Sequence, residues 1–196
     1  MTPPLELRFV LSAPGIAGLP DSRAEVAFVG RSNVGKSSLL NALANRKALA
    51  HTSKTPGRTQ LLNFFELDDS GTSVVDCPGY GYASVPKRVQ ATWQAMLEGY
   101  FLERAPLRMI LVLVDGEIGP TKLDVQMLEW LRANELPFTV IASKHDKVKA
   151  SQREKRKVEL AEGCAVDPGD VVWVSAAKNT GVDTLRGRVR GWLSAG

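Results

Sequence analysis

The sequence lacks the features that mark several classes of protein. It has only two cysteines, Cys77 and Cys164, which are too few for a disulfide framework or a cysteine-rich zinc site. We therefore expect a reducing, cytoplasmic setting. No apolar run approaches the roughly 18 residues that cross a bilayer, so we expect no membrane insertion. The opening MTPPLELRFVLSAPG has no basic segment followed by a long apolar block, so we also expect no signal peptide.

The sequence also lacks a large excess of positive or negative charge. The formal net charge is +4, which an ordinary solvated surface explains. It would indicate a nucleic-acid partner only if basic residues gathered on one face, and the two basic runs at 147–157 and 186–190 are where such a face could form. What is present is 196 residues with a 44% hydrophobic share, which fits one globular domain.

Apolar segments alternate with amphipathic ones along most of the chain. Runs at 24–30, 108–115 and 171–175 have the continuous apolar character of buried strands, and amphipathic helices are expected between them. Residues 61–67 and 72–77 predict two antiparallel strands joined by a tight turn. The pattern predicts an α/β three-layer sandwich whose mostly parallel sheet has about six strands, one of them antiparallel. Ligands of such sheets bind at the carboxyl ends of the strands.

The first of these strand ends carries a phosphate-binding motif. The segment GRSNVGKS, Gly30 to Ser37, fits the pattern G-x-x-x-x-G-K-[ST] between an expected strand and an expected helix. Its glycines let backbone N–H groups turn toward a phosphate, and the helix that follows presents its free N–H groups to the same anion. Lys36 adds a positive charge for the β- and γ-phosphates, and the Ser37 hydroxyl is a ligand for Mg²⁺. The segment predicts a P-loop nucleotide site.

Two further segments predict the rest of the phosphate and metal site. In SVVDCPGYG, Asp76 ends an apolar strand, where it can hold Mg²⁺ through a water, and the N–H of Gly79 can contact the γ-phosphate. A loop threonine commonly completes the Mg²⁺ shell in proteins that sense the γ-phosphate. Thr59 is our choice because it directly precedes a strand, and Thr55 is the alternative.

The segment SKHD predicts which base is bound. The carboxylate of Asp146 can accept hydrogen bonds from both N1–H and the exocyclic amine of guanine, a pair that adenine cannot offer. Lys144 can lie along the base and brace the P-loop. In VSAAK, the N–H of Ala176, next to Ser175, can meet the guanine carbonyl oxygen. The nucleotide is therefore predicted to be GTP or GDP.

In this order the motifs resemble the guanine-nucleotide-binding domain of the Ras-like, translation-factor-related GTPases. The finer resemblance rests on EVAFVGRSNVGKSSLLNAL, TSKTPGRTQLLNFFEL, VDCPGYGYA, DVQMLEW and KNTGVDTLRGRVRGWL, and is to the EngB/YsxC/YihA family of bacterial ribosome-biogenesis GTPases. It implies a G domain at 23–196, and the proline-rich first residues with the run LRFVLS predict an arm or edge strand at 1–22. It also implies GTP or GDP binding with Mg²⁺, assembly of the large ribosomal subunit from rRNA and ribosomal proteins, and a need in cell division and septation. We expect a monomer.

The site residues are predicted in three groups. The catalytic group comprises Lys36, Thr59, Gly79 and Asn33, and the metal ligands are Ser37, Thr59 and Asp76. The nucleotide-binding group comprises Gly30, Arg31, Ser32, Asn33, Val34, Gly35, Lys36, Ser37, Ser38, Gly57, Arg58, Thr59, Asp76, Pro78, Gly79, Ser143, Lys144, Asp146, Ser175, Ala176 and Ala177.

Two positions depart from the usual pattern. The guanine motif begins with Ser143 where asparagine or threonine is usual, and because serine keeps a hydroxyl we expect guanine selectivity to survive. Tyr80 stands where Ras-like proteins place the glutamine that orients the attacking water. A tyrosine does not replace that role simply, so intrinsic hydrolysis is expected to be slow, on the order of the 10⁻⁴ per second of unassisted Ras.

Asn33 has two readings. In related GTPases that lack the glutamine, an asparagine at this P-loop position helps to hold a K⁺ ion, which supplies positive charge beside the phosphates. The other reading is a residue that shapes the loop, a common role for asparagine in turns. Comparing turnover in KCl and NaCl decides between them, since equal rates reject the ion.

Two rival functions remain beside the GTPase switch. The first is another P-loop enzyme, such as an ATPase or a small-molecule kinase, against which SKHD argues. The second is a binding module that docks in a nucleotide-dependent way and whose hydrolysis is incidental, which Tyr80 favours.

Overall fold

The computed structural model describes residues 2–50, 61–68, 70–81 and 87–194, without the side chains of residues 87–90 and 93. The strands are β1 Leu7–Ala13, β2 Ala24–Gly30, β3 Leu62–Leu67, β4 Thr72–Asp76, β5 Leu107–Asp115, β6 Phe138–Ser143 and β7 Val172–Trp173. The α-helices are α1 Lys36–Leu43, α2 Lys87–Glu103, α3 Lys122–Ala133, α4 Arg153–Cys164 and α5 Val182–Ser194, and 3₁₀ turns lie at Ile16–Gly18, His145–Lys147, Ala150–Gln152 and Pro168–Asp170.

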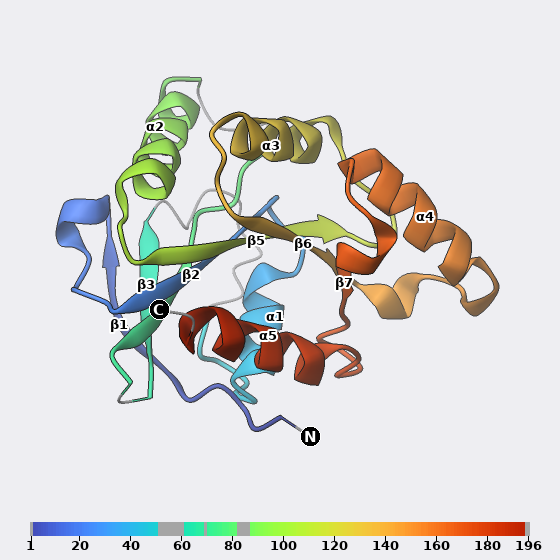
Figure 1. Ribbon diagram of the computed structural model, residues 1–196, viewed down its shortest axis with the longest axis horizontal. Coiled ribbons are helices and arrows are strands. Elements are labelled where there is room, and N and C mark those ends of the chain that lie inside the picture. The colour runs from blue at the N-terminus through green and yellow to red at the C-terminus, as the bar shows by residue number, and fades with distance from the viewer. Residues whose placement is uncertain (1, 51–60, 69, 82–86, 195–196) are drawn as a thin grey trace.

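A single sheet in the order β1-β3-β4-β2-β5-β6-β7 forms the centre of the described part of the chain (Figure 1). β4, β2, β5, β6 and β7 are parallel to one another, while β3 pairs antiparallel with both β4 and β1. The mostly parallel α/β sandwich predicted from the sequence is confirmed. The described residues give seven strands where about six were expected, because residues 7–13 add an edge strand beside β3.

Helices cover both faces of the sheet. In Figure 1, α2 and α3 lie above the sheet and α1 and α5 below it. The apolar side chains of α1 and α5 form one core with the lower face, and those of α2, α3 and α4 form a second core with the upper face. β2 is buried along its whole length because both cores meet it, which explains its continuous apolar sequence. None of the described helices is long and apolar enough to cross a membrane.

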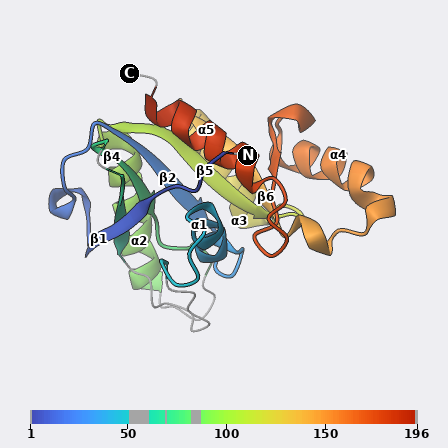
Figure 2. The same cartoon turned by 90° about the horizontal axis from the view of Figure 1, so that it is seen from below.

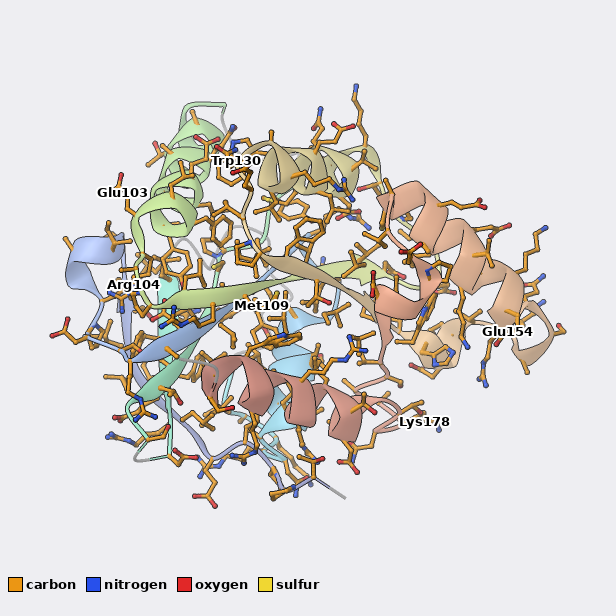
Figure 3. All side chains as sticks on the ribbon, in the orientation of Figure 1. Glu103, Arg104, Met109, Trp130, Glu154 and Lys178 are labelled. Atoms are coloured by element: carbon orange, nitrogen blue, oxygen red, sulfur yellow. The ribbon has the colours of Figure 1, made fainter. Side chains whose placement is uncertain are left out.

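A buried carboxylate fastens the end of α2 to the start of β2. Glu25 is fully buried and accepts hydrogen bonds from the Tyr100 hydroxyl at 2.5 Å and the Ser73 hydroxyl at 3.0 Å. Arg104, labelled in Figure 3 just beyond α2, pairs with Glu25 at 3.1 Å and offsets its charge. Burial, and then the nearby Glu25 charge, raise the pKa of Tyr100, so its hydroxyl stays protonated and donates. This cluster lies at the end of β2 away from the P-loop.

The basic run at 186–190 is partly used inside the fold. Arg186 is buried on α5 and donates to the backbone carbonyls of Ala42 at 2.7 Å and Leu43 at 2.9 Å, at the end of α1. Arg190 donates to the carbonyl of Pro4 at 3.0 Å, in the N-terminal segment that Figure 2 shows passing close to α5. Since helix ends carry carbonyls without partners in the helix, Arg186 acts as a cap for α1.

We expect Arg186→Met to lower the free energy of unfolding by about 2 kcal/mol, because it keeps the side chain's length but removes two charge-assisted hydrogen bonds to the carbonyls of Ala42 and Leu43, which then keep only backbone N–H donors. Chemical denaturation measures the change. Arg188→Met on the exposed side of the same helix is the control and should stay within about 0.5 kcal/mol. Equal effects of the two changes would contradict the capping role.

Candidate nucleotide site

Loops that follow β2, β4, β6 and β7 meet at one edge of the sheet. These four strands are parallel, so their carboxyl ends lie at the same edge. Each of the four loops holds one of the motifs found in the sequence. The fold therefore brings the predicted phosphate, metal and base segments together, at the position where open α/β sheets bind ligands.

The loop between β2 and α1 has the backbone of a phosphate cradle. Asn33 and Gly35 both have left-handed conformations, with φ of 62° and 101°. Gly35 caps α1 without any side-chain hydrogen bond, so the first N–H groups of the helix remain available to an anion. A Cβ on Gly30 would lie 2.9 Å from the carbonyl oxygen of Leu113 on β5, so only glycine fits there. Ser37 is half-buried in the first turn of α1, and Ser38 is exposed.

Lys36 and Asp76 form a buried ion pair at the centre of the site. The ammonium of Lys36, on α1, contacts Oδ1 of Asp76 at the end of β4, and both residues are at most 9% exposed. Among the described residues, the other carboxylate oxygen accepts a long hydrogen bond of 3.4 Å from the amide of Asn63. Burial raises the pKa of the neighbouring Cys77 thiol, so Cys77 is a neutral, space-filling side chain.

Gly79 and Tyr80 lie against the P-loop. Tyr80 N–H donates to the carbonyl of Gly30 at 3.2 Å, and Ser32 N–H donates to the carbonyl of Tyr80 at 3.1 Å. A Cβ on Gly79 would lie 3.1 Å from the nitrogen of Ser32, which shows how closely the two loops approach. The hydroxyl of Tyr80 points to α3, where it donates to Asp124 at 2.8 Å.

The loop after β6 is tied to the P-loop by Ser143. This buried serine donates its hydroxyl to the carbonyl of Val34 at 2.7 Å, with a second acceptor, the carbonyl of Val114, at 3.2 Å. Lys144, in a left-handed conformation with φ of 56°, contacts Asp115 at the end of β5 through a 2.6 Å hydrogen bond. The serine hydroxyl thus links the predicted base loop to the predicted phosphate loop.

Asp146 is oriented by the loop after β7. The hydroxyl of the buried Ser175 donates to Oδ1 of Asp146 at 2.6 Å and accepts the N–H of Lys178 at 3.1 Å; Figure 3 labels Lys178 beyond β7. The hydrogen bond from Ser175 holds the pKa of Asp146 below its ordinary value, so the carboxylate is ionised and accepts hydrogen bonds. Ala176 is half-buried beside this pair, and Ala177 is exposed.

Some predicted residues fall outside the described parts of the chain, and some contacts were not predicted. Thr59, its alternative Thr55, Gly57 and Arg58 lie outside the described residues. The sequence did not predict three residues that hold the site residues in place by hydrogen bonds. Asn63 bonds to Asp76, Asp115 to Lys144, and Asp124 to Tyr80. A capping pattern, Thr121 followed by Asp124, is visible in the sequence and predicts the start of α3, but it gives no sign of Tyr80.

The P-loop after β2, the aspartate at the end of β4 and the Lys-x-Asp loop after β6 together define a P-loop GTPase domain. The family model described as a 50S ribosome-binding GTPase matches residues 25–144. The chain is 45% identical to a probable GTP-binding protein EngB of Pasteurella multocida, over 95% of this chain and 92% of the relative. It is 46% identical to the protein of the same name from Pectobacterium carotovorum, over 95% and 90%. The chain therefore belongs to the EngB family of GTPases.

Solved structures agree with this assignment. A crystal structure of a probable GTP-binding protein EngB has a TM-score of 0.72 and 26% identity, covering 87% of this chain and 98% of that one. Aquifex aeolicus Era bound to GDP·AlF4⁻ has a TM-score of 0.67 and 25% identity, covering 88% of this chain and 57% of Era.

We expect Ser143→Ala to weaken GDP and GTP binding alike, by about tenfold, because it removes the buried hydrogen bond between the base loop and the P-loop. Isothermal titration calorimetry measures both affinities. Ser143→Thr keeps the hydroxyl and should bind nearly as the wild type does. An alanine variant with wild-type affinity would show that the link is not used.

Proposed function

We propose that this GTPase binds GTP and GDP with Mg²⁺, hydrolyses GTP slowly, and acts as a cytoplasmic switch in assembly of the large ribosomal subunit, on which normal division and septation depend. The observation that carries the nucleotide part is the ionised Asp146, fixed by Ser175 at the edge of the sheet that holds the P-loop. The ribosomal part is supported by the family description, which names a 50S ribosome-binding GTPase.

Guanine recognition follows from the charge state of Asp146. Only a deprotonated carboxylate can accept from N1–H and the 2-amino group of guanine together. Ser175 occupies one oxygen from the side and thereby fixes the rotation of the carboxylate. Adenine presents an acceptor at N1 and no 2-amino group, so the same carboxylate disfavours ATP. This argues against the rival reading of an ATPase or a small-molecule kinase.

The described residues fit Mg²⁺ together with a polyphosphate. Among them no cluster of three or more histidine, cysteine, aspartate or glutamate side chains could hold a metal alone. Mg²⁺ in phosphoryl-transfer sites takes few protein ligands, with phosphate oxygens and water completing the shell. The Ser37 hydroxyl and the Asp76 carboxylate are such ligands, and the Lys36 ammonium beside Asp76 would hold the phosphates. When bound, Mg²⁺ would neutralise charge on the β- and γ-phosphates.

The hydrolysis step has no glutamine to orient water at position 80. The Tyr80 hydroxyl is engaged with Asp124, and burial together with the Asp124 charge raises the pKa of Tyr80, so it is not a base. Slow intrinsic turnover is therefore part of the proposal. The left-handed φ of Asn33, 62°, suits a loop-shaping residue and leaves its exposed side chain available to a K⁺ ion, so both readings stand.

We expect Asp146→Asn to weaken GDP binding by roughly a hundredfold or more, because two charge-assisted hydrogen bonds to guanine are lost. The same variant should gain affinity for xanthosine diphosphate, whose 2-carbonyl accepts from the new amide. Competition with a fluorescent nucleotide measures both, and Asp170→Asn, at an exposed site after α4, is the matched control. Unchanged GDP affinity in Asp146→Asn would reject the assignment of the base site.

We propose that exposed basic residues of the runs at 147–157 and 186–190 contact rRNA. This surface is smaller than the sequence suggests, because several members of the runs have partners within the fold. Arg186 and Arg190 are used within the fold, as described above. Lys149 and Arg188 are exposed members of the two runs. Other members of the first run form ion pairs with glutamates on α4, whose outer side is marked by Glu154 in Figure 3. Glu159 lies 3.6 Å from Lys155 and 3.5 Å from Arg156, and Glu154 lies 2.9 Å from Lys157.

We expect the wild-type protein to sediment with large ribosomal subunits more strongly with a GTP analogue than with GDP or no nucleotide. Lys149→Glu and Arg188→Glu should each weaken this association and its salt dependence while GTP binding stays intact. Arg108→Glu, at the exposed start of β5, makes the same charge change as a control. Association that ignores the nucleotide would reject the switch. A GTP-binding variant without hydrolysis that still supported assembly would favour the rival binding module.

A further inference from the structure

Asp124 accepts hydrogen bonds from two segments of the chain and pairs with a cation from a third. This carboxylate, in the first turn of α3, is 0% exposed. Its Oδ1 accepts the hydroxyl of Tyr80 at 2.8 Å. Its Oδ2 accepts both the N–H and the hydroxyl of Thr121 at 2.7 Å, and lies 3.3 Å from Nε of Arg31 in the P-loop.

Capping of α3 accounts for only half of these contacts. A capping box needs Thr121 and one carboxylate oxygen, and an aspartate that served only as a cap could stay at the surface. Here the carboxylate is buried, which is unfavourable unless charge and hydrogen bonds compensate it. Arg31 supplies the charge and Tyr80 supplies the remaining donor. Both come from the nucleotide site, so the buried carboxylate connects that site to α3.

The backbone reinforces the same connection. Arg31 and Tyr80 form a parallel bridge that continues the pairing of β2 with β4 into the loops. Gly79 sits directly before Tyr80, and a Cβ there would lie 3.1 Å from the nitrogen of Ser32, so the two loops are in close contact. The position of the Gly79 N–H is therefore fixed from two sides, by the backbone bridge and by the Tyr80 hydroxyl on Asp124. Burial and the Asp124 charge keep that hydroxyl protonated, so it remains a donor.

We propose that the hydrogen bond from Tyr80 to Asp124 positions the Gly79 N–H for the γ-phosphate and thereby raises the affinity of the site for GTP relative to GDP. This inference rests on the proposed function, in which Gly79 contacts the γ-phosphate. A donor that is held in place before binding needs no ordering when the ligand arrives, so it adds more to affinity than a mobile one. GDP has no γ-phosphate and gains nothing from this N–H. Asp124 is accordingly a positioning residue, acting through Tyr80.

The test is Tyr80→Phe, which removes one hydroxyl and keeps the ring. Asp124 retains Arg31 and both donors of Thr121, so the variant should fold. The quantity measured is the ratio of the affinities for a non-hydrolysable GTP analogue and for GDP. We expect this ratio to fall about tenfold, equivalent to about 1.4 kcal/mol, with GDP affinity changed less than twofold. Hydrogen exchange at residues 76–80 should become faster in the variant.

Tyr100→Phe is the matched control. It removes the same group from a buried tyrosine that also donates to a buried carboxylate, Glu25, at the opposite end of β2. A purely structural effect would lower stability in both variants and leave both ratios unchanged. The inference predicts a lower ratio in Tyr80→Phe alone.

Two results would overturn the inference: an unchanged ratio in Tyr80→Phe, or an equal fall in Tyr100→Phe. The proposed function would be overturned by a different result, a wild-type protein that binds neither GTP nor GDP. That result would overturn the inference as well. A wild type that binds both nucleotides, with an unchanged ratio in Tyr80→Phe, rejects the inference alone.

Discussion

The phosphate loop contains two left-handed residues, Asn33 and Gly35, and its shape depends on hydrogen bonds that other loops supply. Tyr80 exchanges two backbone hydrogen bonds with it, and Ser143 holds the carbonyl of Val34. A loop of this length bound only at its ends would lose more conformational entropy on binding a nucleotide. Because the same contacts join the predicted phosphate, metal and base segments, these segments are organised as one unit.

Buried charge at this edge of the sheet is compensated pair by pair. Each carboxylate lies at or just beyond the end of a strand or in the first turn of a helix, and each faces one cation from another segment. A buried carboxylate without such a partner would strongly destabilise the fold, so these pairs fix which segments must lie together. The three pairs are Asp76 with Lys36, Asp115 with Lys144, and Asp124 with Arg31.

Local signals in the sequence predict most of the fold and the motif-bearing loops, because periodicity and glycine placement act over a few residues. Contacts between distant segments leave no such signal. Tyr80 and Asp124 are 44 positions apart, and Ser143 and Val34 are 109 apart. The basic run around Arg186 shows the same limit, since a charge pattern does not reveal that one member caps another helix. The predicted loop threonine, Thr59, lies outside the described residues and stays a prediction.

The engagement of Tyr80 bears on how a GTPase can work without the usual glutamine. A side chain that orients water must be free to enter the site when the γ-phosphate is bound, whereas a hydroxyl held by a buried carboxylate contributes to order in the resting loop. The held side chain of Tyr80 therefore favours recognition of the γ-phosphate over its hydrolysis. Faster hydrolysis then requires charge or a donor from elsewhere, either an ion held at Asn33 or a group supplied by the partner. Under the proposed function, a switch whose cleavage waits for its partner would remain in the GTP state until docking, which is the behaviour that the proposed role in assembly needs.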